Sequence, residues 1–272
     1  MIVRPVTFYS SALNRRCVCY VGLPDHYDAD ESKRYPVIYL LHGKTGMETD
    51  WLYKGNAEQI IQEMWDKNQL REAIIVMPND GGHSDGTFYV DWYDGSGNFE
   101  QYMIYDLVPM IDAEFRTYPS RLSRVIGGLS MGGYGAVMLA LKNPSLFGAA
   151  VSFSGALGDI LSLTGGEQHL YMASAFAPIL GPAHGEHAQQ YRLKNLALHR
   201  IEENNGPALY INCGKQDYLY EANIGFTNYL RKIGYNHQYE EFEGEHNWDY
   251  WQENLSRGLA FFESYFEKQR KE

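Results

Sequence analysis

The sequence predicts an α/β fold in which a mostly parallel central sheet carries helices on both faces. The first observation behind this prediction is a series of short apolar runs, typical of strands buried on both faces of a parallel sheet. These runs cover residues 36–43, 73–78, 124–128, 149–153 and 208–214. The second observation is that helical periodicity falls between the runs, and such alternation over nearly the whole chain favours a parallel sheet.

The remaining elements follow in chain order. The N-terminal residues predict two strands, 3–10 and 16–23, joined by the turn Ala12-Leu13-Asn14. Apolar residues at helical spacing predict helices at 56–68, 99–115, 131–141, 222–233 and 248–267. Residues 156–198 break this rhythm with a Gly-Gly pair and prolines. We interpret them as an insertion over one end of the sheet, within a single domain that spans residues 1–272.

Composition indicates a globular protein and argues against some classes of binding partner. Hydrophobic residues make up 44% of the 272 residues and charged residues 21%, so a packed core is expected. The net charge of −11 argues against nucleic acid, which needs a basic face, and against an anionic membrane surface. No stretch has the pattern of a signal peptide or a membrane span. The 3 cysteines include Cys17 and Cys19, which are poorly placed to pair on one strand, so we expect a reduced, cytoplasmic protein.

In Gly128-Leu129-Ser130-Met131-Gly132 a buried strand stops and a helix begins. In this arrangement the serine occupies a sharp, strained turn, and side chains two residues to either side would collide. The turn lifts the hydroxyl above the sheet edge beside a helix N-terminus, which favours developing negative charge. The pentapeptide alone is a weak signal. Its context, a strand before and a helix after, predicts that Ser130 is the nucleophile of an α/β-hydrolase fold.

A serine hydroxyl needs a neighbouring imidazole to take its proton, and on this fold the order is Ser, then Asp or Glu, then His. His246 lies in a polar, glycine-bearing loop between a late strand and the last helix, where the base is expected. His237 starts that strand and so belongs to the opposite end of the sheet. His246 is therefore the predicted base.

The acid should follow the preceding strand. Asp217 comes directly after 208–214 and is expected to hold the imidazole in the right tautomer and to stabilise the imidazolium. A helix N-cap or turn role is the alternative for this aspartate. Glu221 is the fallback acid, and Asp159 is a weaker candidate because it lies one strand too early.

Backbone N–H groups must bind the oxygen of the tetrahedral intermediate. One is expected from Met131, the residue after the nucleophile. The other is expected from Lys44, or from Thr45 as second choice, in the loop after 36–43, where glycines allow close backbone approach. His42 is expected to be a buried structural histidine, since His246 already supplies the base.

Aromatic residues cluster in the loops expected at the catalytic end. They predict an apolar or ring-shaped acyl or alcohol group in the site, with ordinary loop packing as the alternative. The expected substrate-binding residues are Trp51, Trp92, Tyr93 and Trp248. The acidic loop 80–85 contains His83, but its spacing matches no metal-site pattern, so we expect neither a metal nor a cofactor.

Four blocks of sequence together carry a family resemblance. They read Leu-Leu-His-Gly-Lys-Thr-Gly, Gly-Gly-Leu-Ser-Met-Gly-Gly-Tyr-Gly-Ala, Cys-Gly-Lys-Gln-Asp-Tyr-Leu-Tyr and Gly-Glu-His-Asn-Trp-Asp-Tyr-Trp. From about residue 5 to 265 the chain resembles the esterase D-like group of α/β-hydrolases, which includes tributyrin, feruloyl and acetylxylan esterases, S-formylglutathione hydrolases and mycolyltransferases. The resemblance implies ester hydrolysis through an acyl-enzyme without a cofactor. It implies that Ser130, Asp217 and His246 form the triad, and that Met131 and the Lys44 region supply the oxyanion donors.

Together these features predict a serine carboxylesterase for small-molecule esters with short acyl groups, with acetylated or feruloylated carbohydrates as candidate substrates. An S-formylglutathione hydrolase-type thioesterase, a peptidase or an acyltransferase on the same triad is the alternative. The thioesterase is less favoured because that subgroup reads Ser-Gly-Leu-Thr-Cys where this chain reads His-Gly-Lys-Thr-Gly. A non-catalytic binding module is disfavoured because all three triad residues are present. The segment 156–198 is expected to shape the pocket, and an apolar rim around it could support a homo-oligomer.

Overall fold

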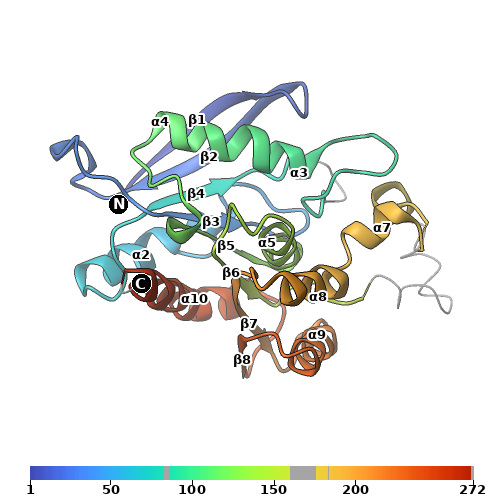
Figure 1. The fold of residues 1–272 in the computed structure, drawn as a ribbon. Helices are drawn as coiled ribbons and strands as arrows, with labels where there is room; N and C mark the ends of the chain where they lie inside the picture. The colour runs from blue at the N-terminus through green and yellow to red at the C-terminus, as the bar shows by residue number, and fades with distance from the viewer. Residues whose placement is uncertain (83–85, 160–175, 183, 271–272) are drawn as a thin grey trace.

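The computed structural model describes residues 1–82, 86–159, 176–182 and 184–270. They form an 8-stranded sheet in the order β1-β2-β4-β3-β5-β6-β7-β8, with helices on both faces (Figure 1). The strands are β1 (Ile2–Ser10), β2 (Arg15–Leu23), β3 (Val37–Leu41), β4 (Ile74–Pro78), β5 (Arg124–Leu129), β6 (Ala149–Phe153), β7 (Ala208–Gly214) and β8 (His237–Phe242). The predicted fold class, a mostly parallel sheet between helical layers, is confirmed.

The buried centre of the sheet is parallel, and its N-terminal edge is antiparallel. The five central strands β4, β3, β5, β6 and β7 and the edge strand β8 pair in parallel. Every residue of β3, β4, β5 and β6 is buried, as expected for strands covered on both faces. By contrast β1 and β2 form an antiparallel hairpin, and β2 also pairs antiparallel with β4. Exposed residues recur along β1, the strand at the outer edge of that hairpin.

Helices divide between the two faces of the sheet. On one face lie α1 (Asp50–Tyr53), α2 (Ala57–Asp66) and α10 (Trp248–Gln269), whose apolar residues share a core with the β3 residues Ile38 and Leu40. The other face is covered by α3 (Phe99–Gln101), η2 (Tyr102–Leu107), α4 (Val108–Glu114), α5 (Met131–Lys142), α8 (Leu193–Glu203) and α9 (Tyr220–Lys232). Further short elements are the 3-10 turns η1 (Tyr27–Ala29) and η3 (Arg121–Ser123), and α7 (Glu186–Gln190) beyond the end of the sheet (Figure 1).

The expected helix 99–115 is not uniform. Its middle, η2, is a π-helical stretch, and the Val108 N–H donates to the carbonyl of Met103, five residues back. Pro109 follows in the first turn of α4 and has no N–H to give. The change of hydrogen-bond register therefore falls where the proline already removes one bond of an α-helix.

The predicted insertion ends inside a helix. The helix α8 begins at Leu193, before the expected boundary at residue 198, and buries Leu193 and Ala197 against the core that α5 shares. Residues 193–198 therefore belong to the helical layer. Much of the rest of the segment, 160–175, lies outside the described residues.

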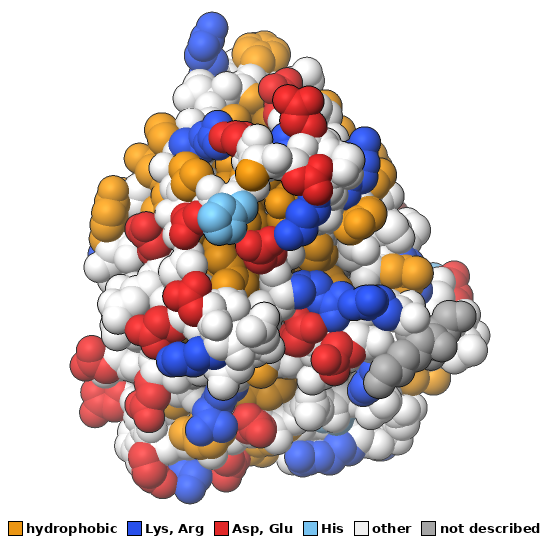
Figure 2. Space-filling model, turned by 90° about the vertical axis from the view of Figure 1, so that its left-hand side faces the viewer, with side chains coloured by type: hydrophobic (Ala, Val, Ile, Leu, Met, Phe, Trp, Pro, Cys, Tyr) orange, Lys and Arg blue, Asp and Glu red, His pale blue; other side chains and the backbone are white. Residues whose placement is uncertain are grey.

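Charge on the face shown in Figure 2 is mixed, with Lys and Arg side chains interspersed among Asp and Glu. This face is the left-hand side of Figure 1, away from α7. Within the part of the chain that the structure describes, no helix has both the length and the apolar character needed to cross a bilayer.

Candidate active site

Ser130 occupies the sharp turn between β5 and α5. Its backbone has φ 54° and ψ −119°, a region that side-chain-bearing residues avoid. A Cβ on Gly128 would collide with the backbone of Gly132, and one on Gly132 would collide with the carbonyls of Leu41 and His42. The glycines of the pentapeptide are therefore required by backbone contacts, as the sequence predicts.

Three side chains from three loops meet in a hydrogen-bond chain. His246 Nε2 lies 2.9 Å from Ser130 Oγ, and His246 Nδ1 lies 2.8 Å from Asp217 Oδ2. Asp217 follows β7 and His246 precedes α10, so both approach from the carboxyl ends of strands. Since a carboxylate only accepts, Nδ1 carries the proton and Nε2 is free to accept the serine hydroxyl.

The Asp217 carboxyl is buried, at 4% exposure, and is held by two donors. The Leu219 N–H donates to Oδ1 at 2.8 Å, beside the imidazole contact. Burial alone would raise the pKa of Asp217, but the hydrogen bonds from His246 and Leu219 outweigh it and lower that pKa below its usual value. The group therefore stays ionised at neutral pH and can stabilise an imidazolium.

The two alternative acids lie elsewhere. Asp159 pairs with Arg192 and Lys194 at 2.6 Å and 3.1 Å. Glu221 is exposed in the first turn of α9. Asp217 is the carboxylate that contacts His246.

Met131 and the loop that contains Lys44, the two expected sources of oxyanion donors, both adjoin Ser130. Met131 is the first residue of α5, and the loop after β3 abuts the nucleophile, since a Cβ on Gly43 would lie 3.3 Å from Ser130 Cβ. Among the described residues no acceptor contacts the N–H of Met131 or of Lys44. Thr45, the second choice for the oxyanion donor, has a left-handed backbone with φ 61°. Met131 therefore directly follows the nucleophile and Lys44 follows a glycine that approaches it, so both stay candidates for the oxyanion donors.

His42 is a structural residue. Its side chain is buried, Nε2 accepts the Asp80 N–H at 3.1 Å, and Nδ1 contacts the Gly43 carbonyl at 2.8 Å. Both ring nitrogens are thus committed to the backbone of the loops after β3 and β4, and His42 cannot serve as a base.

The expected role of two tryptophans in substrate binding is corrected. Trp51 is 1% exposed, and its indole N–H donates to the Leu41 carbonyl at 3.0 Å. Trp92 is also buried, and its indole N–H donates to the Thr87 carbonyl at 3.1 Å. Each ring is enclosed by protein and has its polar atom satisfied, so neither offers a surface to a substrate.

The other two expected aromatics retain some exposure. Tyr93 is exposed, and its ring lies 5.5 Å from that of His187. Trp248 is half-buried and packs edge-on against Trp51 and Trp251, at 5.6 Å and 5.2 Å. Trp248 and Tyr93 remain candidates for substrate contact.

Two aromatic side chains that pack against His246 were not predicted from the sequence. The Trp251 ring lies 4.9 Å from the His246 ring at 89°, and the Tyr218 ring lies 4.4 Å away at 48°. Tyr218 directly follows the acid, and Trp251 follows Trp248 by one helical turn. Both spacings were visible in the sequence as a signal for aromatic residues near the expected site, but the contacts with the imidazole depend on the tertiary structure.

Aromatic side chains also cluster near Met131, the residue after the nucleophile. Phe88 lies 4.8 Å from Phe176 and 6.0 Å from Tyr134, ring to ring, and its N–H points at Met131 Sδ. Phe88 and Tyr89 have φ of 54° and 57°, so this loop is backbone-strained next to the nucleophile helix. Residues 83–85, including His83 of the suspected acidic loop, lie outside the described residues.

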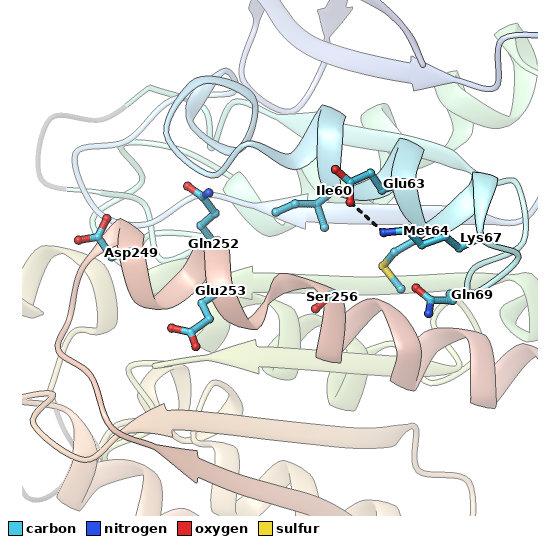
Figure 3. Close-up of a pocket in the computed structure, with 9 residues that line it drawn as sticks. All are labelled: Ile60, Glu63, Met64, Lys67, Gln69, Asp249, Gln252, Glu253 and Ser256. Atoms are coloured by element: carbon cyan, nitrogen blue, oxygen red, sulfur yellow. Dashed lines mark hydrogen bonds and ion pairs between the residues drawn. The ribbon is translucent and has the colours of Figure 1, made fainter.

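A separate cleft of about 650 Å³ runs between α2 and α10 (Figure 3). Its carboxylates include Glu63, which pairs with Lys67, and Glu253. Ser256 lines the cleft, but no histidine does. Over residues 1–82, 86–159, 176–182 and 184–270 no group of three or more His, Cys, Asp or Glu side chains could hold a metal ion. The nucleophile–base pair described above therefore has no counterpart in this cleft.

Comparisons with known proteins identify the family of this chain. The family model described as "Putative esterase" matches residues 10–262. An acetyl esterase from Caldicellulosiruptor saccharolyticus is 26% identical to this chain, over 96% of this chain and 98% of its own length.

Solved structures share the fold. A ferulic acid esterase superposes with a TM-score of 0.82 at 25% identity, over 97% of this chain and 98% of that chain. FphF, a fluorophosphonate-binding serine hydrolase from Staphylococcus aureus, superposes with a TM-score of 0.81 at 24% identity, over 96% of this chain and 98% of that chain. The predicted α/β-hydrolase fold is confirmed.

Proposed function

This chain belongs to that esterase family and is a serine carboxylesterase, and we propose that Ser130, His246 and Asp217 are its catalytic triad. The observation that carries the proposal is the unbroken hydrogen-bond chain from the Ser130 hydroxyl through the imidazole to the buried Asp217 carboxylate. Such a chain lets a weak nucleophile lose its proton as it attacks.

In the first half of the reaction, Ser130 Oγ attacks the ester carbonyl carbon while His246 Nε2 takes the hydroxyl proton. The oxygen of the tetrahedral intermediate accepts hydrogen bonds from the N–H groups of Met131 and Lys44. Since these donors are fixed before the reaction, they stabilise the charge without reorganisation. The C–O bond to the alcohol then breaks, and His246 gives the proton to the departing alcohol oxygen.

In the second half, water attacks the acyl-enzyme carbonyl and His246 takes a proton from that water. The second tetrahedral intermediate collapses, the acid leaves, and the proton returns to Ser130 Oγ. Asp217 holds the imidazole orientation throughout and stabilises the imidazolium without itself becoming protonated. No cofactor takes part in this scheme.

We propose short acyl esters as substrates, with acetylated or feruloylated carbohydrates as the candidates. The names of the acetyl esterase and ferulic acid esterase relatives support this choice. Phe88 and Phe176 supply an aromatic wall near Met131 that suits an apolar or ring-shaped acyl group. The segment 156–198, to which Phe176 belongs, is proposed to shape this part of the pocket within a single domain.

Replacing Ser130 with Ala tests the triad. Hydrolysis of p-nitrophenyl acetate should fall by several orders of magnitude, to the residual rate that binding and the oxyanion donors supply. Ser256→Ala is a matched control, because Ser256 lies in the α2–α10 cleft away from any base and should keep full activity. Unchanged turnover in Ser130→Ala would reject the proposal.

Substrate scope separates the competing activities. A panel of acyl chain lengths, methyl ferulate, acetylated xylo-oligosaccharide and S-formylglutathione distinguishes an esterase from a thioesterase. A peptide amide and a competing alcohol acceptor test peptidase and acyltransferase activity. A fluorophosphonate probe should label Ser130, and the absence of an adduct would favour a non-catalytic binding module.

We further propose that the enzyme works in the cytoplasm on small molecules, not on nucleic acid or at a membrane. The free, buried thiols of Cys17, Cys19 and Cys213 support a reducing compartment. The net charge of −11 supports the absence of a nucleic-acid partner. A homo-oligomer through the rim of 156–198 remains a proposal, which light scattering would test.

A further inference from the structure

Tyr218 is an aromatic side chain left exposed at the centre of the site. It is 75% exposed, yet its ring lies 4.4 Å from the imidazole of His246. Trp251, the other ring on this imidazole, is 6% exposed and belongs to the core of the α10 face. A role in the core therefore accounts for the position of Trp251. Tyr218 contributes little to the core, and most of its ring stays exposed beside His246.

The sheet order places Tyr218 on one particular side of the nucleophile. Ser130 follows β5, and in the sheet β3 lies on one side of β5 while β6, β7 and β8 lie on the other. The expected oxyanion donor Lys44 comes from the loop after β3. Tyr218 comes from the loop after β7, together with the acid.

His246 must deliver its proton to the departing alcohol oxygen, so that oxygen has to sit next to Nε2 and Ser130 Oγ. The Tyr218 ring packs against the same imidazole, with the ring centroids 4.4 Å apart. The alcohol part of an ester bound for attack therefore passes along the exposed ring of Tyr218.

Resting on the proposed function, we propose that Tyr218 is the residue that recognises the alcohol part of the ester. Its hydroxyl donates a hydrogen bond to the alcohol oxygen as the C–O bond breaks, and its ring face receives a ring-shaped alcohol. The proton that the alcohol gains comes from His246, so Tyr218 transfers none. Esters of hydroxylated or alicyclic ring alcohols are the substrate class that this contact favours.

The protonation state of Tyr218 suits a donor. Partial desolvation of the phenol beside His246 and the neighbouring Asp217 carboxylate raise the pKa of Tyr218. The phenol is therefore neutral at the pH where the triad works and has a proton to share.

The experiment compares three acetates that form the same acetyl-enzyme: ethyl acetate, cyclohexyl acetate and p-nitrophenyl acetate. Because deacylation is common to all three, a change in kcat/KM that depends on the alcohol reports on alcohol contact alone. Tyr218→Phe should lower kcat/KM for the ethyl and cyclohexyl esters by about five- to ten-fold, the range of one hydrogen bond. The p-nitrophenyl ester should change by less than about two-fold, since its leaving group needs little help.

Tyr218→Ala removes the ring as well. It should cost the cyclohexyl ester about a further five-fold and leave the ethyl ester near the Tyr218→Phe value. Tyr105→Phe is the matched control, because Tyr105 is similarly exposed, at 71%, on η2. An equal loss for all three esters, or no loss for the two unactivated ones, would overturn the proposal.

Fluorophosphonate labelling separates this inference from the proposed function. Fluoride leaves in place of an alcohol, so both Tyr218 variants should label Ser130 at the wild-type rate. A labelling rate that falls as far as kcat/KM would mean that Tyr218 acts by positioning His246, which also overturns alcohol recognition. If the wild-type protein neither labels nor hydrolyses any acetate, the proposed function itself fails.

Discussion

The loops after β3 and after β7 flank the same serine but contribute to the site in different ways. The loop after β3 contributes backbone. Its Gly43 approaches Ser130 closely, and both ring nitrogens of His42 contact backbone atoms of the protein interior. The loop after β7 offers side chains, namely the Asp217 carboxylate and the exposed Tyr218 phenol. Function on the first side therefore depends on the absence of a Cβ, and on the second side on the identity of side chains.

The largest effect is expected on the β7 side, from Asp217→Asn. An amide can donate to the imidazole and stabilise the wrong tautomer, so kcat should fall by about 10⁴-fold. Steady-state kinetics with p-nitrophenyl acetate measures this. Glu221→Gln, in the first turn of α9, is the control and should be close to wild type. A loss of less than about ten-fold would remove Asp217 from the triad.

On the β3 side, Gly43→Ala tests the backbone contribution. The added Cβ would lie 2.8 Å from Leu129 Cδ1 and 3.3 Å from Ser130 Cβ. Because Leu129 is buried and has little room to move, we expect the loop to shift away from the nucleophile. A displaced oxyanion donor should lower kcat by about 10²-fold with a smaller effect on KM.

Gly225→Ala is the control for this change, because a Cβ there meets nothing within 4 Å on α9. That substitution should leave kcat unchanged and raise helix stability slightly. Wild-type kcat in Gly43→Ala would show that the loop after β3 does not supply an oxyanion donor.

Trp51→Phe tests whether Trp51 stabilises the fold and has no part in substrate binding. It leaves the Leu41 carbonyl without the indole N–H, which should lower the free energy of unfolding by about 1–3 kcal/mol. KM for acetates should stay unchanged, because the ring is enclosed. Chemical denaturation and steady-state kinetics measure the two quantities. Tyr53→Phe, an exposed ring on the same helix, should stay within about 0.5 kcal/mol of wild type. A rise in KM without a loss of stability would restore Trp51 to the pocket.

The smallest effect concerns pH and stability. The pKa of Asp217 is lower in the folded protein than its usual value, so ionised Asp217 stabilises the fold at neutral pH. This contribution is lost as pH falls below about 4 and the carboxylate takes up a proton. The difference in unfolding free energy between wild type and Asp217→Asn should therefore shrink with falling pH. A difference that is constant from pH 7 to 3 would contradict the lowered pKa.

Much of the fold and of the proposed triad could be predicted because each rests on local signals. Buried strands such as β3 and β6 are short apolar runs, and the bounds of β6 and β7 match the prediction residue for residue. Asp217 and His246 could be chosen because chain order on a parallel sheet fixes which loops meet at its carboxyl edge. The start of α8 could not be predicted this way, since its burial of Leu193 and Ala197 against the core decided it.

The aromatic residues mark the limit of such reasoning. Trp51, Trp92 and Tyr218 all lie in or beside loops at one end of the sheet, and composition treats them alike. Whether a ring is enclosed or exposed depends on which other segments cover it. The structure buries the first two and leaves the third open beside His246.

By itself the sequence determined the reaction chemistry: a strained serine turn, an acid and a base in the right order, and glycines where backbones touch. These are properties of strand ends and turns, which short stretches of sequence encode directly. Only the tertiary structure decided which side chains face the substrate, because exposure is a sum over contacts from distant segments. Ser130 could therefore be predicted from its pentapeptide together with the strand before it and the helix after it, whereas the exposure of Tyr218 beside His246 depends on the segments that leave it uncovered.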